Sequence, residues 1–277
     1  MSVEYEASPD DSPDDASSGD RWTTWDTASR GPRPRPDWVV TELSAVDTER
    51  GILKTGKEAD VHLIEREAPG RSCLLAAKRY RSAEQRMFHR DAGYLEGRRV
   101  RRSREMRAMR RRTEFGRSLI ADQWALAEFG ALSRLWTLSQ ERGGIRVPYP
   151  VSVDSSELLL EFIGDPDGVA APRLAQARPS ADDLPGLWGQ LVRGLETLAG
   201  AGLAHGDLSP YNLLLRDGEL VFIDLPQVVD VVANPQGQQF LRRDVENMCA
   251  WFASRGLDPA LADVDAVLGS LLGLAWG

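Results

Sequence analysis

The sequence predicts an α+β fold in which short strands dominate the first half of the chain and helices dominate the second half. Three observations lead to this prediction. Apolar runs separated by polar turns lie between residues 51 and 80, as in antiparallel strands. Apolar residues recur at helical spacing over residues 118–142 and 182–200. A hairpin of two short apolar strands follows the second of these helices.

Size and composition narrow the class of protein. The length of 277 residues allows one large domain or two lobes with sizeable cores, and the net charge of −8 argues against a general nucleic-acid binder. Cys73 and Cys249 are too few for a disulfide framework or a cysteine-rich zinc site, and we expect both as buried thiols. There is no run of about 18 apolar residues, and the acidic N-terminus is unlike a signal peptide. We therefore expect a cytoplasmic protein.

Residues 1–36 are rich in Asp, Ser, Pro and Gly and contain few apolar residues that could form a core. We predict a disordered acidic tail here. Trp22 and Trp25 are the exceptions, and we expect them to be loosely ordered or to form a short docking element. Folded structure is predicted to begin near Asp37.

The first three strands surround a polar turn. One strand leads into the turn at residues 55–60, and the chain returns in a second strand from Val61. A third strand covers residues 73–80 and carries Lys78 near its end, where a lysine can reach nucleotide phosphates from inside a lobe. The turn has one central glycine, Gly56, so it is neither a G-x-G-x-x-G loop nor a Walker loop.

Segment 81–117 differs in composition from the strands before it. Nine arginines lie between Arg98 and Arg112, with few apolar residues among them. The segment is either a solvated, partly helical insertion or an arm that binds RNA, phosphate or an acidic partner. Because its charge is opposite to that of the N-terminal tail, a contact between the two is a further alternative.

Helices are predicted in four places, at residues 118–142, 182–200, 239–253 and within 257–276. The first helix contains Glu128 and ends at Gly143-Gly144. The strand 157–164, which follows it, ends in a glycine where a hinge between two lobes would lie.

The hairpin at residues 213–223 carries polar side chains at one end. Its two strands are joined by a polar turn at residues 216–219. Asp207 and Asn212 precede the first strand and Asp224 follows the second, so we expect these side chains to converge. Phosphoryl transfer needs such groups, because one carboxylate orients the acceptor while an amide and a carboxylate hold Mg²⁺ against the phosphates.

The five-residue spacing from Asp207 to Asn212, with Asp224 after a hydrophobic strand, matches the protein-kinase pattern. The alternative is an ordinary hairpin in which the aspartates are turn residues and His205 belongs to the core. In a kinase the strand lysine pairs with a helix glutamate, and Glu128 is the candidate. A surface role for that glutamate is the alternative.

Six motifs in the same order make the chain from about residue 50 to 250 resemble the RIO family of atypical serine/threonine protein kinases, most closely its type-one branch. They are Lys54-Thr-Gly-Lys-Glu-Ala-Asp-Val, Ala77-Lys78, Leu159-Leu-Glu-Phe-Ile-Gly, His205-Gly-Asp-Leu-Ser-Pro-Tyr-Asn, Ile223-Asp-Leu-Pro-Gln and Phe240-Leu-Arg-Arg-Asp244. The resemblance implies a two-lobed protein-kinase-like fold with a small antiparallel N-lobe over 37–163 and a reduced, mainly helical C-lobe over 164–277. It also implies that 81–117 is a flexible loop that this family inserts.

The resemblance places ATP and Mg²⁺ in the cleft between the lobes. It implies that the turn covers the phosphates through Thr55, Gly56, Lys57, Glu58 and Ala59. Lys78 would contact the α- and β-phosphates and be held by Glu128. Backbone groups from Glu161 to Ile163 would face the adenine ring.

For the chemistry, the resemblance implies that Asp207 is the catalytic carboxylate and that Asn212 and Asp224 bind the metal. Some RIO proteins cycle as ATPases through a phosphorylated metal-site aspartate, which here would be Asp224. Only 53 residues follow Asp224, too few for the usual activation segment and peptide-docking helices. Pro226 is closer to the type-two branch of the family.

Two other functions are alternatives. A small-molecule phosphotransferase of the aminoglycoside or choline type also uses a His-Gly-Asp-x-x-x-x-Asn loop, although the turn at 55–59 and the short C-terminus argue against it. A nucleotide-gated assembly factor would instead use ATP to switch its affinity for a ribosomal particle or RNA. The arginines of 98–112 favour that role, and it is compatible with a complete kinase site.

Overall fold

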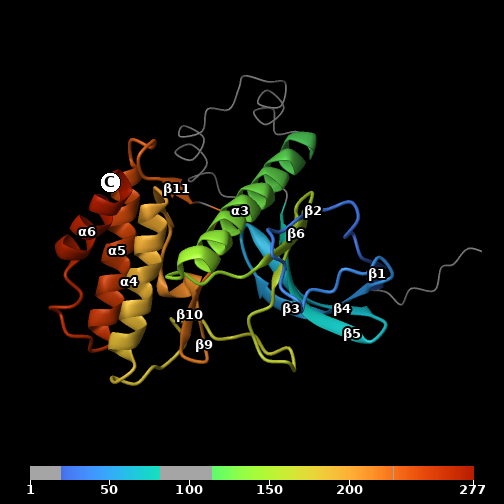
Figure 1. Cartoon of the computed structure of the whole chain (residues 1–277), viewed down its shortest axis with the longest axis horizontal. Helices are drawn as coiled ribbons and strands as arrows, with labels where there is room; N and C mark the ends of the chain where they lie inside the picture. The colour runs from blue at the N-terminus through green and yellow to red at the C-terminus, as the bar shows by residue number, and fades with distance from the viewer. Residues whose placement is uncertain (1–19, 82–113, 227) are drawn as a thin grey trace, which may run out of the picture.

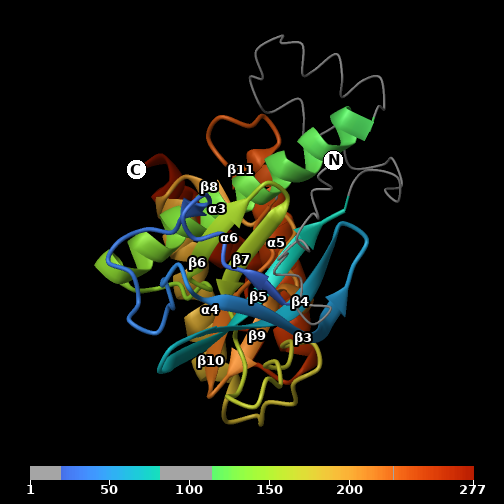
Figure 2. The same ribbon diagram turned by 90° about the vertical axis from the view of Figure 1, so that its right-hand side faces the viewer.

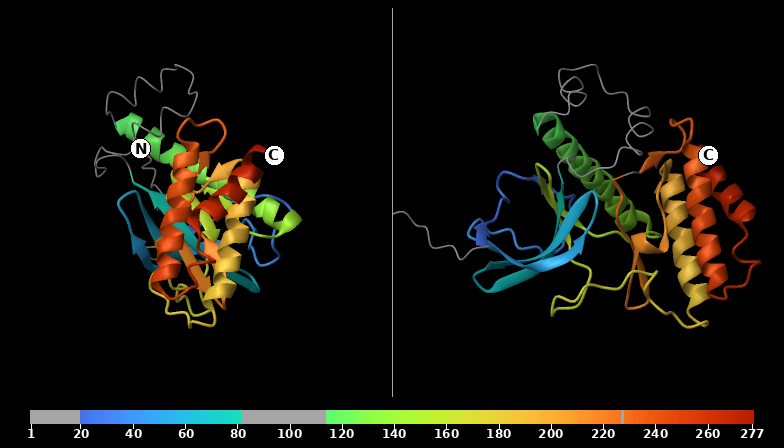
Figure 3. Two further views of the ribbon diagram at one scale, coloured as in Figure 1. Left: turned by 90° about the vertical axis from the view of Figure 1, so that its left-hand side faces the viewer. Right: turned by 180° about the vertical axis from the view of Figure 1, so that it is seen from behind.

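The computed structural model describes residues 20–81, 114–226 and 228–277. Figure 1 shows a curled antiparallel sheet on one side and a group of helices with short strands on the other. Helix α3 (Glu114–Arg142) runs between these two parts, and the view from behind in Figure 3 shows the same separation. This is the two-lobed α+β arrangement expected from the sequence, with the sheet as the N-lobe and the helices as the C-lobe.

The N-lobe sheet has seven strands in the order β1-β3-β4-β5-β7-β6-β2, and every neighbouring pair is antiparallel. The strands are β1 (Asp20–Trp22), β2 (Ser29–Arg30), β3 (Val46–Thr55), β4 (Ala59–Ala68), β5 (Arg71–Tyr80), β6 (Pro150–Asp154) and β7 (Glu157–Glu161). Figure 2 looks onto the curled sheet. Strands β3, β4 and β5 confirm the three strands predicted around the polar turn.

Residues 20–36 correct the predicted disordered tail. Strand β1 pairs with β3 and β2 pairs with β6, so this one segment covers both edges of the sheet. Trp25 is buried in the core, whereas Trp22 is exposed. The segment is ordered because the two sheet edges supply backbone hydrogen-bond partners, which composition alone does not reveal. Residues 1–19 lie outside the described residues.

Helix α3 packs on the sheet through part of the apolar spacing that predicted it, since Leu126 of that pattern is exposed. Its buried side chains include Ala121, Trp124, Ala125, Leu132, Leu135 and Trp136. The Trp136 ring meets the Tyr149 ring edge-on, with centroids 4.9 Å apart. Gly143, at φ +69°, ends the helix in the left-handed conformation that glycine adopts easily. The arginine-rich residues 98–112 lie outside the described residues, so the roles predicted for them stay predictions.

The C-lobe contains the helices α4 (Leu184–Gly200), α5 (Gly237–Ser254) and α6 (Val264–Trp276), with the 3₁₀ turn η2 (Pro210–Asn212). Its short strands are β8 (Leu203–Ala204), β9 (Leu213–Arg216), β10 (Glu219–Phe222) and β11 (Val229–Asp230). Strands β9 and β10 form the predicted hairpin, and β8 pairs with β11. Among the described helices, none combines the length and apolarity needed to cross a bilayer.

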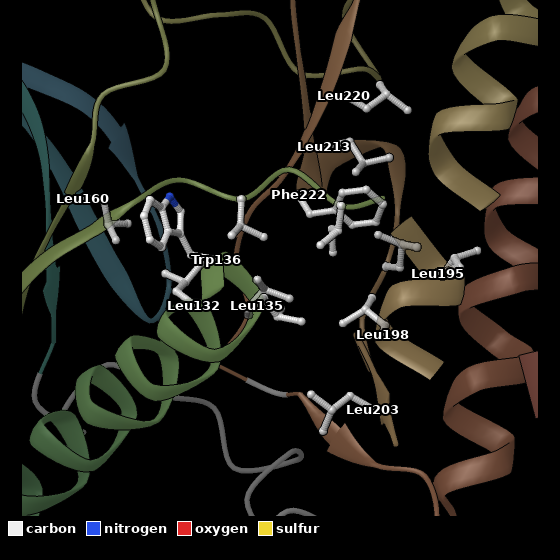
Figure 4. Close-up of a cluster of buried hydrophobic side chains, with 14 of the residues drawn as sticks. Leu132, Leu135, Trp136, Leu160, Leu195, Leu198, Leu203, Leu213, Leu220 and Phe222 are labelled. Atoms are coloured by element: carbon white, nitrogen blue, oxygen red, sulfur yellow. The ribbon is translucent and has the colours of Figure 1, made fainter. Parts of the chain in front are cut away.

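The lobes share apolar packing beneath the hairpin. Figure 4 shows the α3 side chains close to those of α4 and the hairpin, with Phe222 between them. Gly194 of α4 is required here, because an added Cβ would lie 2.4 Å from the Phe222 ring. The predicted buried thiols are found as a buried Cys249 and a partly buried Cys73. This packing fixes the position of the hairpin relative to the sheet.

Candidate active site

A cavity of about 550 Å³ lies where the sheet, α3 and the hairpin meet. This volume is in the range of pockets that bind small molecules and cofactors. Its lining includes nine of the residues singled out in the sequence, namely Gly56, Lys57, Glu58, Ala59, Lys78, Glu128, Glu161, Ile163 and Asp224. Thr55, Asp207 and Asn212 are not among the lining residues. The β3–β4 turn therefore contributes four lining residues from Gly56 onwards.

Lys78 joins three elements at this cavity. Its Nζ lies 2.9 Å and 2.8 Å from the two carboxylate oxygens of Glu128 and 2.7 Å from Oδ1 of Asp224. Glu128 is fully buried on α3, and its Oε1 also accepts a hydrogen bond from the Leu225 N–H at 3.1 Å. The Lys78–Glu128 ion pair predicted from the sequence is therefore present. It connects β5 and α3 to the residue that follows Asp224.

The charges of this cluster stabilise one another. The ammonium of Lys78 lowers the pKa of Asp224 to about 2, although burial opposes this. Burial disfavours the charged form of Lys78, but the two carboxylates outweigh it and hold the pKa of Lys78 well above its usual range. Both groups are therefore ionised at neutral pH. An anionic Asp224 is the form that can bind a cation.

Tyr80 completes the environment of Glu128. It lies two residues after Lys78 on β5, so both side chains are on the same face of the strand. Its buried hydroxyl donates a hydrogen bond to Oε2 of Glu128. Burial and the Glu128 charge raise the pKa of the Tyr80 hydroxyl well above its ordinary value, so it remains a donor. Sequence reasoning missed Tyr80, and its two-residue spacing from Lys78 was the available signal.

The loop before the hairpin is held to it by three contacts. The Asn212 side-chain amide donates to the Asp207 carbonyl at 2.8 Å. The Ile223 N–H donates to the Asn212 carbonyl at 3.0 Å, and His205 Nε2 donates to the Ile223 carbonyl at 3.1 Å. Asp224, at φ +64°, has left-handed backbone, which is uncommon for a residue with a side chain. These contacts hold Asp207, Asn212 and Ile223 together at the end of the hairpin that Asp224 follows, and of the three predicted polar residues Asp224 lines the cavity.

Helix α5 binds the same loop from the other side. The Asp244 carboxylate is fully buried and accepts hydrogen bonds from the N–H groups of Gly206 and Leu208 at 2.7 Å and 2.8 Å. Arg243 donates to the Gly206 carbonyl, and its guanidinium lies 3.9 Å from Asp207 Oδ1. Burial raises the pKa of Asp244, which its hydrogen bonds and His205 partly offset. Helix α5 therefore fixes the backbone on both sides of Asp207.

The RIO domain family model matches residues 74–266, from β5 to α6. This span is more than half of the chain and contains Lys78, Glu128, the loop at Asp207 and the hairpin end at Asp224. The chain belongs to the RIO family.

Relatives agree with this assignment. The chain is 37% identical over 224 residues to the RIO-type serine/threonine-protein kinase Rio1 of Haloferax volcanii, covering 80% of this chain and 68% of that protein. It is 31% identical over 223 residues to the serine/threonine-protein kinase RIO1 of Chaetomium thermophilum, covering 75% of this chain and 40% of that protein. A RIO3 kinase of Bos taurus matches 52% of this chain. The matches to type-one proteins are longer, as the motifs predicted.

Two residues near this RIO site, Arg173 and Asp244, had no predicted role, and only Arg173 lies outside the six motifs. Arg173, in the segment between β7 and α4, lines the cavity and donates to the Tyr211 carbonyl beside Asn212. Asp244 ends one of the six motifs, but the sequence alone did not indicate what it contacts. Asn247, three residues later, donates to the Leu208 carbonyl at 3.0 Å, so Asp244 and Asn247 contact the loop from one face of the helix. The three-residue spacing of these two polar residues was the signal available in the sequence.

Proposed function

We propose that this chain is a RIO-type serine/threonine protein kinase that transfers the γ-phosphoryl group of ATP with the help of Mg²⁺. One observation carries the proposal: Lys78 of the sheet binds Glu128 of α3 and Asp224 of the hairpin at one cavity. That ion-pair cluster lies beside a loop with the Asp-to-Asn spacing of kinases. The relatives are named as serine/threonine-protein kinases, which supports the same reaction.

The nucleotide is proposed to occupy the 550 Å³ cavity. Lys78 supplies a cation for the phosphates, and the turn from Thr55 to Ala59 covers them. The chain from Glu161 to Ile163 supplies backbone groups for the adenine. The Ile163 carbonyl accepts from the Ala171 N–H and the Glu161 N–H donates to the Tyr149 carbonyl, both at 2.9 Å, so the base would use other backbone groups of this stretch.

The residues at the hairpin end fit a magnesium site. Because the Asn212 amide nitrogen donates to the Asp207 carbonyl, the side-chain oxygen of Asn212 remains as a metal ligand. The ionised carboxylate of Asp224 is the second protein ligand, and Mg²⁺ commonly takes only one or two carboxylates besides phosphate oxygens. When bound, the metal would neutralise charge that develops on the transferred group.

Asp207 is proposed to orient the acceptor hydroxyl and to receive its proton. Its backbone is fixed on both sides by Asp244, and its side chain is 40% exposed, so it is accessible to a substrate from outside. Asp207→Ala should abolish transfer from labelled ATP to the chain or to a general protein acceptor. The affinity for ATP, measured by calorimetry, should stay within a few-fold of wild type. Near-normal transfer by this variant would contradict the proposal.

An ATPase cycle is a further proposal on the same site. The carboxylate of Asp224 faces the cavity, and a carboxylate there could accept the γ-phosphoryl group as an acyl phosphate. Labelled ATP would then leave a hydroxylamine-sensitive label on the chain, absent in Asp224→Asn. A hydroxylamine-resistant label on serine or threonine would instead indicate autophosphorylation. A role with ribosomal particles or RNA through residues 98–112, and a cytoplasmic location, stay predictions from the sequence.

A further inference from the structure

All lysines of this chain lie at the same cavity. The sequence has 34 lysines and arginines, and only Lys54, Lys57 and Lys78 are lysine. All three line the cavity, where Arg173 is the only arginine among the lining residues. The proposed function already uses Lys57 and Lys78. It gives no role to Lys54, which lies on β3 immediately before the turn.

The strand register places Lys54 on the same face of the sheet as Lys78. Val61 of β4 is the cross-strand partner of Lys54 on one side and of Lys78 on the other. Residues directly opposite in neighbouring strands point to the same face. Two interstrand spacings of about 4.8 Å place the two lysine backbones roughly 10 Å apart. Val61 also lines the cavity, so both lysine side chains lie beside the same space.

The charge around Lys54 is poorly compensated. Lys78 contacts two carboxylates, whereas no carboxylate within the described residues lies at ion-pair distance from Lys54. Partial burial lowers the pKa of Lys54, and the cations Arg173 and Lys78 lower it further, while the carboxylates of Asp224 and Glu58 raise it. Lys54, Lys78 and Arg173 line one cavity, and a bound polyanion would stabilise such a group of positive charges.

We propose that Lys54 is a second phosphate-binding lysine that, with Lys78, holds the polyphosphate chain of a nucleoside di- or triphosphate on the two sides of Val61. This inference rests on the proposed nucleotide site and adds a residue to it. Lysine suits this position because its ammonium is a compact charge on a flexible stem that can follow a phosphate chain. Affinity should therefore depend on Lys54 for phosphorylated ligands and not for the nucleoside.

Calorimetric titration of the full chain with ATP, ADP and adenosine tests this dependence. Lys54→Met should weaken binding of ATP and ADP by about tenfold, the usual effect of losing one charge-assisted contact. The affinity for adenosine should be unchanged, and Lys54→Arg should restore most of the ATP affinity. Arg50→Met is the matched control, since Arg50 is on the same strand, pairs with Glu65 and is not among the lining residues.

Reductive methylation followed by mass spectrometry gives a second measurement, because the chain has only three lysine amines to follow. ATP should slow the modification of Lys54, and adenosine should not. If Lys54→Met keeps wild-type ATP affinity while Lys78→Met weakens it, the role of Lys54 is overturned and the nucleotide site stands. If the wild-type chain binds neither ATP nor ADP, the nucleotide site itself is refuted, and this inference with it.

Discussion

Asp244→Ala is the substitution that tests most directly how the loop around Asp207 is held. The carboxylate is fully buried and accepts two backbone hydrogen bonds, from Gly206 and Leu208. Truncation leaves both N–H groups without their acceptor, at a cost of about 1–3 kcal/mol for each buried group. We expect the free energy of unfolding to fall by about 2–5 kcal/mol, a large part of the roughly 5–15 kcal/mol typical of a folded protein.

The measurement is urea unfolding of the wild type, Asp244→Ala, Asp244→Asn and a control. The Asn variant keeps one oxygen acceptor and has no buried charge, so about half of the loss is expected. Glu246→Ala is the control, because Glu246 is an exposed residue of the same helix whose ion pair with Arg242 is 3.6 Å long, and exposed pairs contribute little. An Asp244→Ala variant within about 0.5 kcal/mol of wild type would refute the reasoning.

Three further predictions concern the site and its surroundings. Lys78→Ala should weaken ATP binding by about tenfold or more, because a charge-assisted contact contributes roughly 1.5–3 kcal/mol; calorimetry at wild-type affinity would contradict the assignment. The pKa of Asp224 is lowered to about 2, so its stabilising contribution is complete above about pH 4 and is lost as the pH falls towards 2. Between pH 4 and pH 2, Asp224→Asn should therefore lose about 1 kcal/mol less stability than the wild type, a value reduced because the Asp224 side chain is partly exposed. Equal acid unfolding of the two proteins would count against this. Deletion of residues 98–112 should leave the melting temperature nearly unchanged and reduce binding to RNA or ribosomal particles. Unchanged binding at several salt concentrations would contradict this prediction.

Features that depend on local spacing were predictable from the sequence. The helical periods of α3 and α4, the apolar runs of β3 to β5 and the hairpin β9–β10 were predictable, since each is set by residues close together in the chain. The hairpin also predicted that Asp207 and Asn212 lie near its end, where hydrogen bonds join Asn212 to Asp207 and to Ile223. The Lys78–Glu128 pair joins residues 50 positions apart, and it was predictable only because a known kinase pattern supplied the partner.

Contacts between distant segments, which no local pattern encodes, became visible in the folded structure alone. Residues 20–36 have the composition of a disordered tail, yet they are ordered because two sheet edges formed by later strands accept them. Asp244 looks like one more charged residue of a helix until the fold places it against loop N–H groups 36 and 38 positions earlier. The strand register, in which Val61 is the partner of both lysines, places Lys54 on the same face of the sheet as Lys78. These contacts depend on burial and backbone pairing between segments that are far apart in the chain. The sequence alone therefore did not reveal them.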